Sequence, residues 1–280
     1  MRTALRMNVK KTLSEGLSDR HIKYREDGHQ LIDDSKVTEK ILQSSINDII
    51  LPYSKQRIAT LFGGNIRIAY SISLYELQCI FNKHGGGPEP NVNNKNVCMK
   101  PDGGIIFAIV NNIEYPILII EDKVQGTNDL RKKNGEKKQA LGNAIERGAK
   151  NVRGAEMLFS SNLNIFPYAL FASGCDFHSS ETIAKRIEMM NYGYPNHTIE
   201  LNKNKTFDVE NEIATKILPN ININNRNGKN VISVFVKTHK WDELEHGTSR
   251  WTKNEYAMIC CDIIDKSLIK LSEYLASSMG

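Results

Sequence analysis

Two apolar runs separated by a pair of asparagines constrain the fold of this chain more than any other feature of its sequence. Residues 105–110 and 115–120 are apolar throughout, and Asn111-Asn112 between them is a hairpin signal. Strands that are apolar on both faces are typical of the centre of a sheet that is covered on both sides. The sequence therefore predicts a buried β-hairpin at the centre of a layered domain.

Polar residues stand at the two open ends of this hairpin. Pro101-Asp102 precedes the first run, and Glu121 and Lys123 follow the second. The hairpin would bring the two carboxylates together, and carboxylate oxygens are suitable ligands for a divalent metal. Lys123 would share a face with Glu121, because strand side chains repeat every two residues. Such a trio suits hydrolysis of a phosphodiester, in which the metal polarises the phosphate and the lysine orients or deprotonates the water.

Each of these residues also has a simpler interpretation. Asp102 stands before Gly103-Gly104, where an aspartate is common in an ordinary turn. Lys123 could be an exposed lysine at the end of a strand. Glu121 is harder to explain in this way, because a carboxylate at the end of a buried strand is costly without a metal or a cation beside it.

A basic stretch follows the hairpin. The chain carries a net charge of +5, whereas residues 123–153 hold nine Lys/Arg against three Asp/Glu, a net charge of +6. A localised basic stripe beside a metal-type site indicates a polyanion as the partner. A solvated charged loop would have the same composition.

The remaining periodicities predict an α/β fold with a central mixed β-sheet flanked by helices. We expect a polar N-terminal arm over 1–34 and a single catalytic and DNA-recognition domain over 35–280. Helices are predicted from Asp34 or Ser35 to a stop at Pro52, from Leu74, from Gln139, over 181–190, and after the capping-box pattern Thr252-Lys253-Asn254-Glu255. Further strands are predicted over 66–72 at a sheet edge, 166–172 and 231–236.

The cysteines and the lengths of the apolar runs indicate in which cellular compartment the protein is expected. Five cysteines are an odd number, and none has the spacing of a zinc site, so we expect reduced and mostly buried thiols. We see neither the apolar core of a signal peptide near Met1 nor a run of the ~20 apolar residues that a membrane helix needs. The expected location is the cytoplasm.

At these residues the chain resembles the EcoRI-type type II restriction endonucleases, which have the PD-(D/E)xK nuclease fold. The resemblance covers roughly the last two thirds of the chain, and the hexapeptide Gly-Asn-Ala-Ile-Glu-Arg is its most specific part. It is carried by Lys100 to Gly104, Glu121 with Lys123, Gly142 to Arg147 with Lys150-Asn151, Phe166-Pro167-Tyr168 with Leu170-Phe171, and Asn191-Tyr192-Gly193.

The resemblance implies a role for each matched residue of the catalytic trio. Asp102 and Glu121 would bind Mg²⁺, and Lys123 would act on the attacking water. Relatives usually carry a small residue between the glutamate and the lysine, where this chain has Asp122. We expect the Asp122 side chain to point to the other face of the strand, while its backbone carbonyl remains available as a metal ligand.

The resemblance also implies DNA-reading residues. Asn143, Ala144, Glu146 and Arg147 would enter the major groove and read an inner AATT sequence, in agreement with the bidentate pairing of asparagine with adenine. An ordinary amphipathic helix start with an asparagine cap is the alternative for this segment. Arg186 matches a family arginine that is used at the outer base pair.

Two departures leave the outer base pair open. Ile183 stands where relatives have a second arginine, and Gln139 replaces a methionine near the outer cytosine. The sequence therefore predicts the inner AATT but not the complete recognition site.

Taken together, the sequence predicts a homodimeric, Mg²⁺-dependent type II restriction endonuclease that acts on double-stranded DNA and leaves 5′-phosphate ends. The family implies a cognate DNA methyltransferase in the same cell, with no stable complex expected. Two alternatives remain, namely a structure-selective repair or recombination nuclease of the same fold and a catalytically inactive DNA-binding protein.

Overall fold

The structure of the chain is a computed structural model. The structure describes residues 34–84, 95–124, 135, 167–173, 197–203, 230–237 and 250–278. The chain divides into two units, Met1–Val37 and Thr38–Gly280. The side-chain contacts described below lie within the second unit, and the helix that begins at Asp34 starts in the first.

A six-stranded mixed sheet forms the centre of this unit. Its strand order is β1-β4-β5-β6-β8-β7. The first three of these strands pair antiparallel, and β5, β6, β8 and β7 pair parallel. The strands are β1 (Asn65–Ala69), β4 (Gly104–Val110), β5 (Ile113–Val124), β6 (Tyr168–Ser173), β7 (His197–Lys203) and β8 (Asn230–Lys237). The predicted α/β fold with a mixed central sheet is confirmed.

The predicted hairpin is the pair β4–β5. Asn111 and Asn112 have φ angles of 51° and 62°, the left-handed conformation that a tight hairpin turn requires and that asparagine tolerates. The strand β5 runs three residues beyond Glu121, because its end pairs in parallel with β6. Glu121 therefore lies inside a strand rather than at its end.

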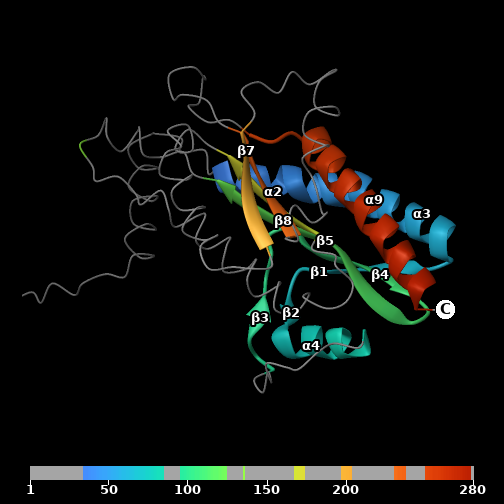
Figure 1. The fold of residues 1–280 in the computed structure, drawn as a ribbon. Helices are drawn as coiled ribbons and strands as arrows, with labels where there is room; N and C mark the ends of the chain where they lie inside the picture. The colour runs from blue at the N-terminus through green and yellow to red at the C-terminus, as the bar shows by residue number, and fades with distance from the viewer. Residues whose placement is uncertain are drawn as a thin grey trace, which may run out of the picture. The chain divides into compact units, whose positions relative to one another are not determined.

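Three helices in the described part of the chain contact the sheet: α3 (Leu51–Phe62) contacts the edge strand β1, and α4 (Leu74–Lys83) and α9 (Lys253–Ser277) contact β5. Among the described residues the first helix is α2 (Asp34–Ser45), which passes through a π-helical turn η1 (Ile46–Ile50) and continues as α3. The C-terminal helix α9 contacts both α3 and β5 (Figure 1). The shorter helix α4 directly follows β2 (Ile72–Ser73), which pairs with the later strand β3 (Cys98–Met99) in a small two-stranded sheet.

The prediction that Pro52 ends the first helix is wrong. Pro52 occupies the first turn of α3, where its missing N–H would have no partner within that helix. The π-helical turn before it widens the helical spiral, so the chain remains helical from Asp34 to Phe62. The helix instead ends at Gly63, whose φ of 62° is the left-handed conformation of a glycine C-cap.

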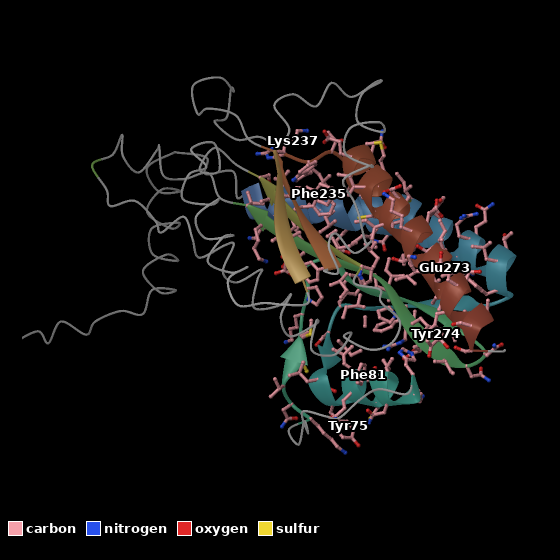
Figure 2. The ribbon with its side chains drawn as sticks, in the orientation of Figure 1. Tyr75, Phe81, Phe235, Lys237, Glu273 and Tyr274 are labelled. Carbon is pink, nitrogen blue, oxygen red and sulfur yellow. The ribbon has the colours of Figure 1, made fainter. Side chains whose placement is uncertain are left out.

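Aromatic side chains join the parallel strands to α9. The ring of Phe171 on β6 lies within 5.5 Å of the rings of Phe235, Trp251 and Tyr256, measured between centroids. All four side chains are buried. Figure 2 labels Phe235 on β8. Burial of these large rings supplies much of the apolar area that stabilises the contact between sheet and helix.

An ion pair and a capping box tie the end of β8 to the start of α9. Both carboxylate oxygens of Glu255 lie 2.7 Å from Lys237 Nζ, and Glu255 is 1% exposed. The same carboxylate accepts a hydrogen bond from the Thr252 backbone, and Thr252 Oγ1 accepts one from the Glu255 backbone. The predicted capping box is confirmed, and its glutamate has a second role as a buried ion-pair partner.

Three further expectations concern two helices, membrane-spanning segments and the burial of the cysteines. The helices expected from Gln139 and over 181–190 lie outside the described residues. No helix within the described residues is both long and apolar enough to span a membrane. Cys260 is buried, but Cys79 and Cys98 are exposed, so the expectation of mostly buried thiols does not hold for these two.

Candidate active site

The three residues of the predicted catalytic trio lie close together where β4 begins and β5 ends. Lys123 Nζ lies 2.6 Å from Asp102 Oδ2 and 2.5 Å from Glu121 Oε1. The same ammonium lies 3.1 Å from the backbone oxygen of Asp122. Three oxygen atoms thus surround one cationic nitrogen.

A tight turn places Asp102 beside β5. Gly104 N donates to Pro101 O at 2.9 Å, and Gly103 N donates to Ile120 O at 3.0 Å. A Cβ atom on Gly103 would lie 2.6 Å from Cβ of Ile120, so only glycine allows this close approach. We refer to residues 101–104 as the catalytic turn.

Backbone amides hold the two carboxylates in place. The Asp102 amide donates to Glu121 Oε2 at 3.3 Å, and the Asp122 amide donates to Asp102 Oδ2 at 3.2 Å. The carboxylate of Glu121 is buried, whereas the side chain of Asp102 is 43% exposed. One carboxylate is therefore fixed in the protein interior, and the other is partly open to solvent.

The ionisation of Lys123 follows from this arrangement. Burial alone would lower the pKa of the Lys123 ammonium, but the carboxylates of Glu121 and Asp102 outweigh burial and raise it. Lys123 is therefore positively charged at neutral pH, and it offsets part of the charge of the two carboxylates.

Asp122 points away from the trio, as expected from strand alternation. In the sheet register it is level with Phe171 and Phe235, the aromatic residues that face α9. Burial raises the pKa of the Asp122 carboxyl to about 7, and the hydroxyl of Tyr256 opposes this rise. Asp122 Oδ1 and Tyr256 OH are close neighbours, yet neither makes a hydrogen bond of good geometry among the described residues.

Tyr168 is a neighbour of the trio for which the sequence predicts no separate role. It pairs with Ile119, so it shares a sheet face with Glu121 and Lys123. The side chain is 3% exposed, and burial, followed by the charges of Glu121 and Asp102, raises the pKa of its hydroxyl well above the usual value. Its position in the matched Phe-Pro-Tyr segment was visible in the sequence, but its proximity to the carboxylates depends on the pairing of β5 with β6.

The DNA-reading candidates cannot be placed beside the trio. Asn143, Ala144, Glu146, Arg147 and Arg186 all lie outside the described residues, as does nearly all of the basic stretch. Their roles remain predictions from the sequence.

The donor set at the trio fits a divalent cation. Carboxylate and carbonyl oxygens are the ligands that Mg²⁺ prefers, and the three oxygens around Lys123 Nζ already converge on one positive charge. Among the described residues no group of three or more His, Cys, Asp or Glu side chains could hold a metal ion. A metal here would therefore be held by two carboxylates together with backbone, water or substrate oxygens.

Comparison with known proteins gives one family. The family model described as "Restriction endonuclease EcoRI" matches residues 70–278, a range that includes the catalytic turn, β5, β6 and α9. No curated protein sequence matches the chain.

Proposed function

Since the chain belongs to the EcoRI family of type II restriction endonucleases, we propose that it cuts both strands of DNA at a short palindrome containing AATT, in a Mg²⁺-dependent reaction. The observation that carries this proposal is the convergence of Asp102, Glu121 and Lys123, with both carboxylates within 2.6 Å of the same ammonium nitrogen. A DNA-binding protein without catalytic activity would have no need to gather a buried glutamate and an aspartate around one lysine.

The site suggests a division of labour in the hydrolysis. Asp102 and Glu121 would hold Mg²⁺, with the Asp122 carbonyl as a third protein oxygen. Bound there, the ion would polarise the scissile phosphate and lower the pKa of water. Lys123, as an ammonium, would orient the attacking water and stabilise the negative charge that develops on the phosphate. Attack on phosphorus with loss of the 3′ oxygen leaves a 5′-phosphate and a 3′-hydroxyl.

Base reading is proposed for the segment that follows the hairpin. Asn143 would pair with adenine, Ala144 would contact thymine methyl groups, and Glu146 would accept from base amino groups and orient Arg147. Arg186 is proposed to act at the outer base pair. The basic stretch over 123–153, with a net charge of +6, would lie against phosphates.

We further propose a homodimer. A two-fold axis that relates two subunits matches the symmetry of a palindrome, so that each subunit cuts one strand. A cognate DNA methyltransferase would protect the host DNA, since a restriction activity without one would cut the genome of its own cell.

Digestion of a long DNA of known sequence tests this proposal. The purified protein with Mg²⁺ should give the same set of discrete fragments in every digest, and excess EDTA should prevent all cutting. The fragments should religate with DNA ligase without prior kinase treatment, because their ends carry 5′-phosphates. A smear of fragments would instead indicate a nuclease that reads DNA structure, and uncut but bound DNA would indicate a protein without catalytic activity.

A further inference from the structure

The catalytic turn has a contact with α2 that neither the sequence nor the family match assigns. The backbone oxygen of Asp102 accepts a hydrogen bond from Gln43 Nε2 at 3.4 Å. The turn's own hydrogen bonds use the Pro101 oxygen instead, so the Asp102 carbonyl is available to this helix. Gln43 therefore contacts the backbone of a proposed metal ligand from a part of the chain 59 residues away.

Tyr70 anchors the other end of the Gln43 amide. The hydroxyl of Tyr70 donates to Gln43 Oε1 at 3.1 Å. Rotation of the amide by half a turn would place Oε1 against the Asp102 carbonyl, and two acceptors would then face each other. The Asp102 carbonyl thus selects the donor end of the amide, and the Tyr70 hydroxyl holds the acceptor end.

Tyr70 also packs directly on the turn. A Cβ atom on Gly104 would lie 3.2 Å from Tyr70 Cδ1 and 3.1 Å from the Ala69 oxygen, so the ring passes close to the glycine backbone. Gly104 has a φ of +80°, which other residues rarely adopt. The turn, Tyr70 and Gln43 form a closed ring of contacts, which we call the α2 clamp.

We propose that Gln43, anchored by Tyr70, is a positioning residue for Asp102 in the cleavage reaction. This inference rests on the proposed function, because it assigns Asp102 a catalytic task. Gln43 lies before residues 70–278, the range that the family model matches, so its assignment comes from the geometry of this chain. Gln43 holds the Asp102 carbonyl, and the Glu121 carboxylate accepts from the Asp102 amide, so both backbone polar groups of Asp102 have a partner.

Two substitutions separate the hydrogen bonds from packing. Gln43→Met keeps the length of the side chain but can neither donate to Asp102 nor accept from Tyr70. Tyr70→Phe keeps the ring against Gly104 and removes only the hydroxyl. The matched controls are Gln56→Met, at an exposed position of α3, and Tyr75→Phe, whose ring would remain beside Lys95.

The first measurement is single-turnover cleavage at saturating DNA, over a series of Mg²⁺ concentrations. Gln43→Met should lower the rate constant by about ten- to a hundredfold, the scale expected when a reacting group is misplaced by a fraction of an ångström to an ångström. It should also raise the Mg²⁺ concentration needed for half-maximal rate, while the Kd for DNA stays within about twofold. Tyr70→Phe should lower the rate constant and raise the required Mg²⁺ concentration by smaller factors than Gln43→Met does. Both control variants should match the wild type.

The second measurement does not depend on activity. Hydrogen–deuterium exchange of the peptide that contains Asp102, Gly103 and Gly104 should be several-fold faster in Gln43→Met than in Gln56→Met, because loss of the clamp favours local opening of the turn. Exchange in α9 should not change.

The outcomes distinguish this inference from the proposed function. Wild-type protein that cuts at a defined site, together with a Gln43→Met variant that cuts equally fast, would overturn the role of Gln43 and leave the proposed function intact. Faster exchange with an unchanged cleavage rate would also overturn it, because the clamp would then be a structural contact only. Wild-type protein that cuts no DNA would refute the proposed function and the role of Gln43 in cleavage together, and the exchange data would still report whether the clamp holds the turn.

Discussion

The Lys123 ammonium lies 2.6 Å from Asp102 Oδ2, although 21 positions in the sequence separate the two residues. The hairpin β4–β5 accounts for this proximity, because Asp102 precedes its first strand and Lys123 belongs to its second. The same strand carries Glu121 on the face that Lys123 shares, and it turns Asp122 toward α9.

Removal of the lysine tests the chemistry of the trio. Lys123→Ala should abolish DNA cleavage, because Lys123 brings one positive charge to both carboxylates. Specific DNA binding should stay within about tenfold of wild type, since base reading is assigned to other residues. Cleavage assays and gel-shift titrations would measure the two effects, with Lys270→Ala on the surface of α9 as a control that should cut normally. A Lys123→Ala protein that cuts at the wild-type rate would refute the assignment.

The carboxyl of Asp122 should make stability depend on pH. Its pKa is raised to about 7 in the folded protein, compared with 3.8 when it is unperturbed. Below pH 4 both states bind the proton, so this group has no effect there. As the pH rises from 4 to 7, the unfolded chain ionises while the folded protein keeps the proton, and the group therefore lowers stability progressively before levelling off above pH 7.

Asp122→Asn removes this pH-dependent contribution. The variant should be more stable than wild type at pH 8, by an amount on the order of a few kcal/mol at most, and the difference should shrink toward pH 4. Urea unfolding of both proteins across this range would measure it. A constant difference between the two proteins at all pH values would show that Asp122 does not titrate in this range, because Tyr256, Asp102, Lys123 and Glu121 are the same in both.

The sequence predicts those features of this arrangement that are encoded by residues close together in the chain. The hairpin, the trio and the capping box of α9 were predicted because each is encoded within a few residues or by one turn. The stop at Pro52 was wrong because a proline that ends one helix and a proline in the first turn of the next look alike in sequence. The sequence does not predict the proximity of Tyr168 to the trio or the contact of Gln43 with Asp102, because the first depends on strand pairing and the second on helix placement across long separations.

The basic stretch over 123–153 should make DNA binding strongly salt-dependent. If the dimer makes roughly 6–10 phosphate contacts, its affinity should fall by ~10³–10⁵-fold between 50 and 200 mM salt. Fluorescence anisotropy with a short duplex would give the slope of affinity against salt. A nearly flat titration would show that these charges form a solvated surface instead.

Substitutions in the reading segment should separate specific from non-specific binding. Each good bidentate pair contributes roughly 1–3 kcal/mol of discrimination, so Asn143→Ala should lose at least about tenfold in specific affinity. Its non-specific affinity at the same salt should be nearly unchanged. Arg186→Ala should relax the preference at the outer base pair while the inner AATT is still required. Binding selection over randomised six-base-pair sites would report both results, and equal loss of specific and non-specific affinity in Asn143→Ala would contradict the assignment.

The most direct measurement of the central claim is to sequence the fragment ends after the wild-type protein has digested a genome of known sequence in the presence of Mg²⁺. The trio of Asp102, Glu121 and Lys123, in a chain of the EcoRI family, predicts that every cut falls at one short palindrome with AATT at its centre. Ends scattered over unrelated sequences, or cuts at a palindrome without AATT, would contradict this account.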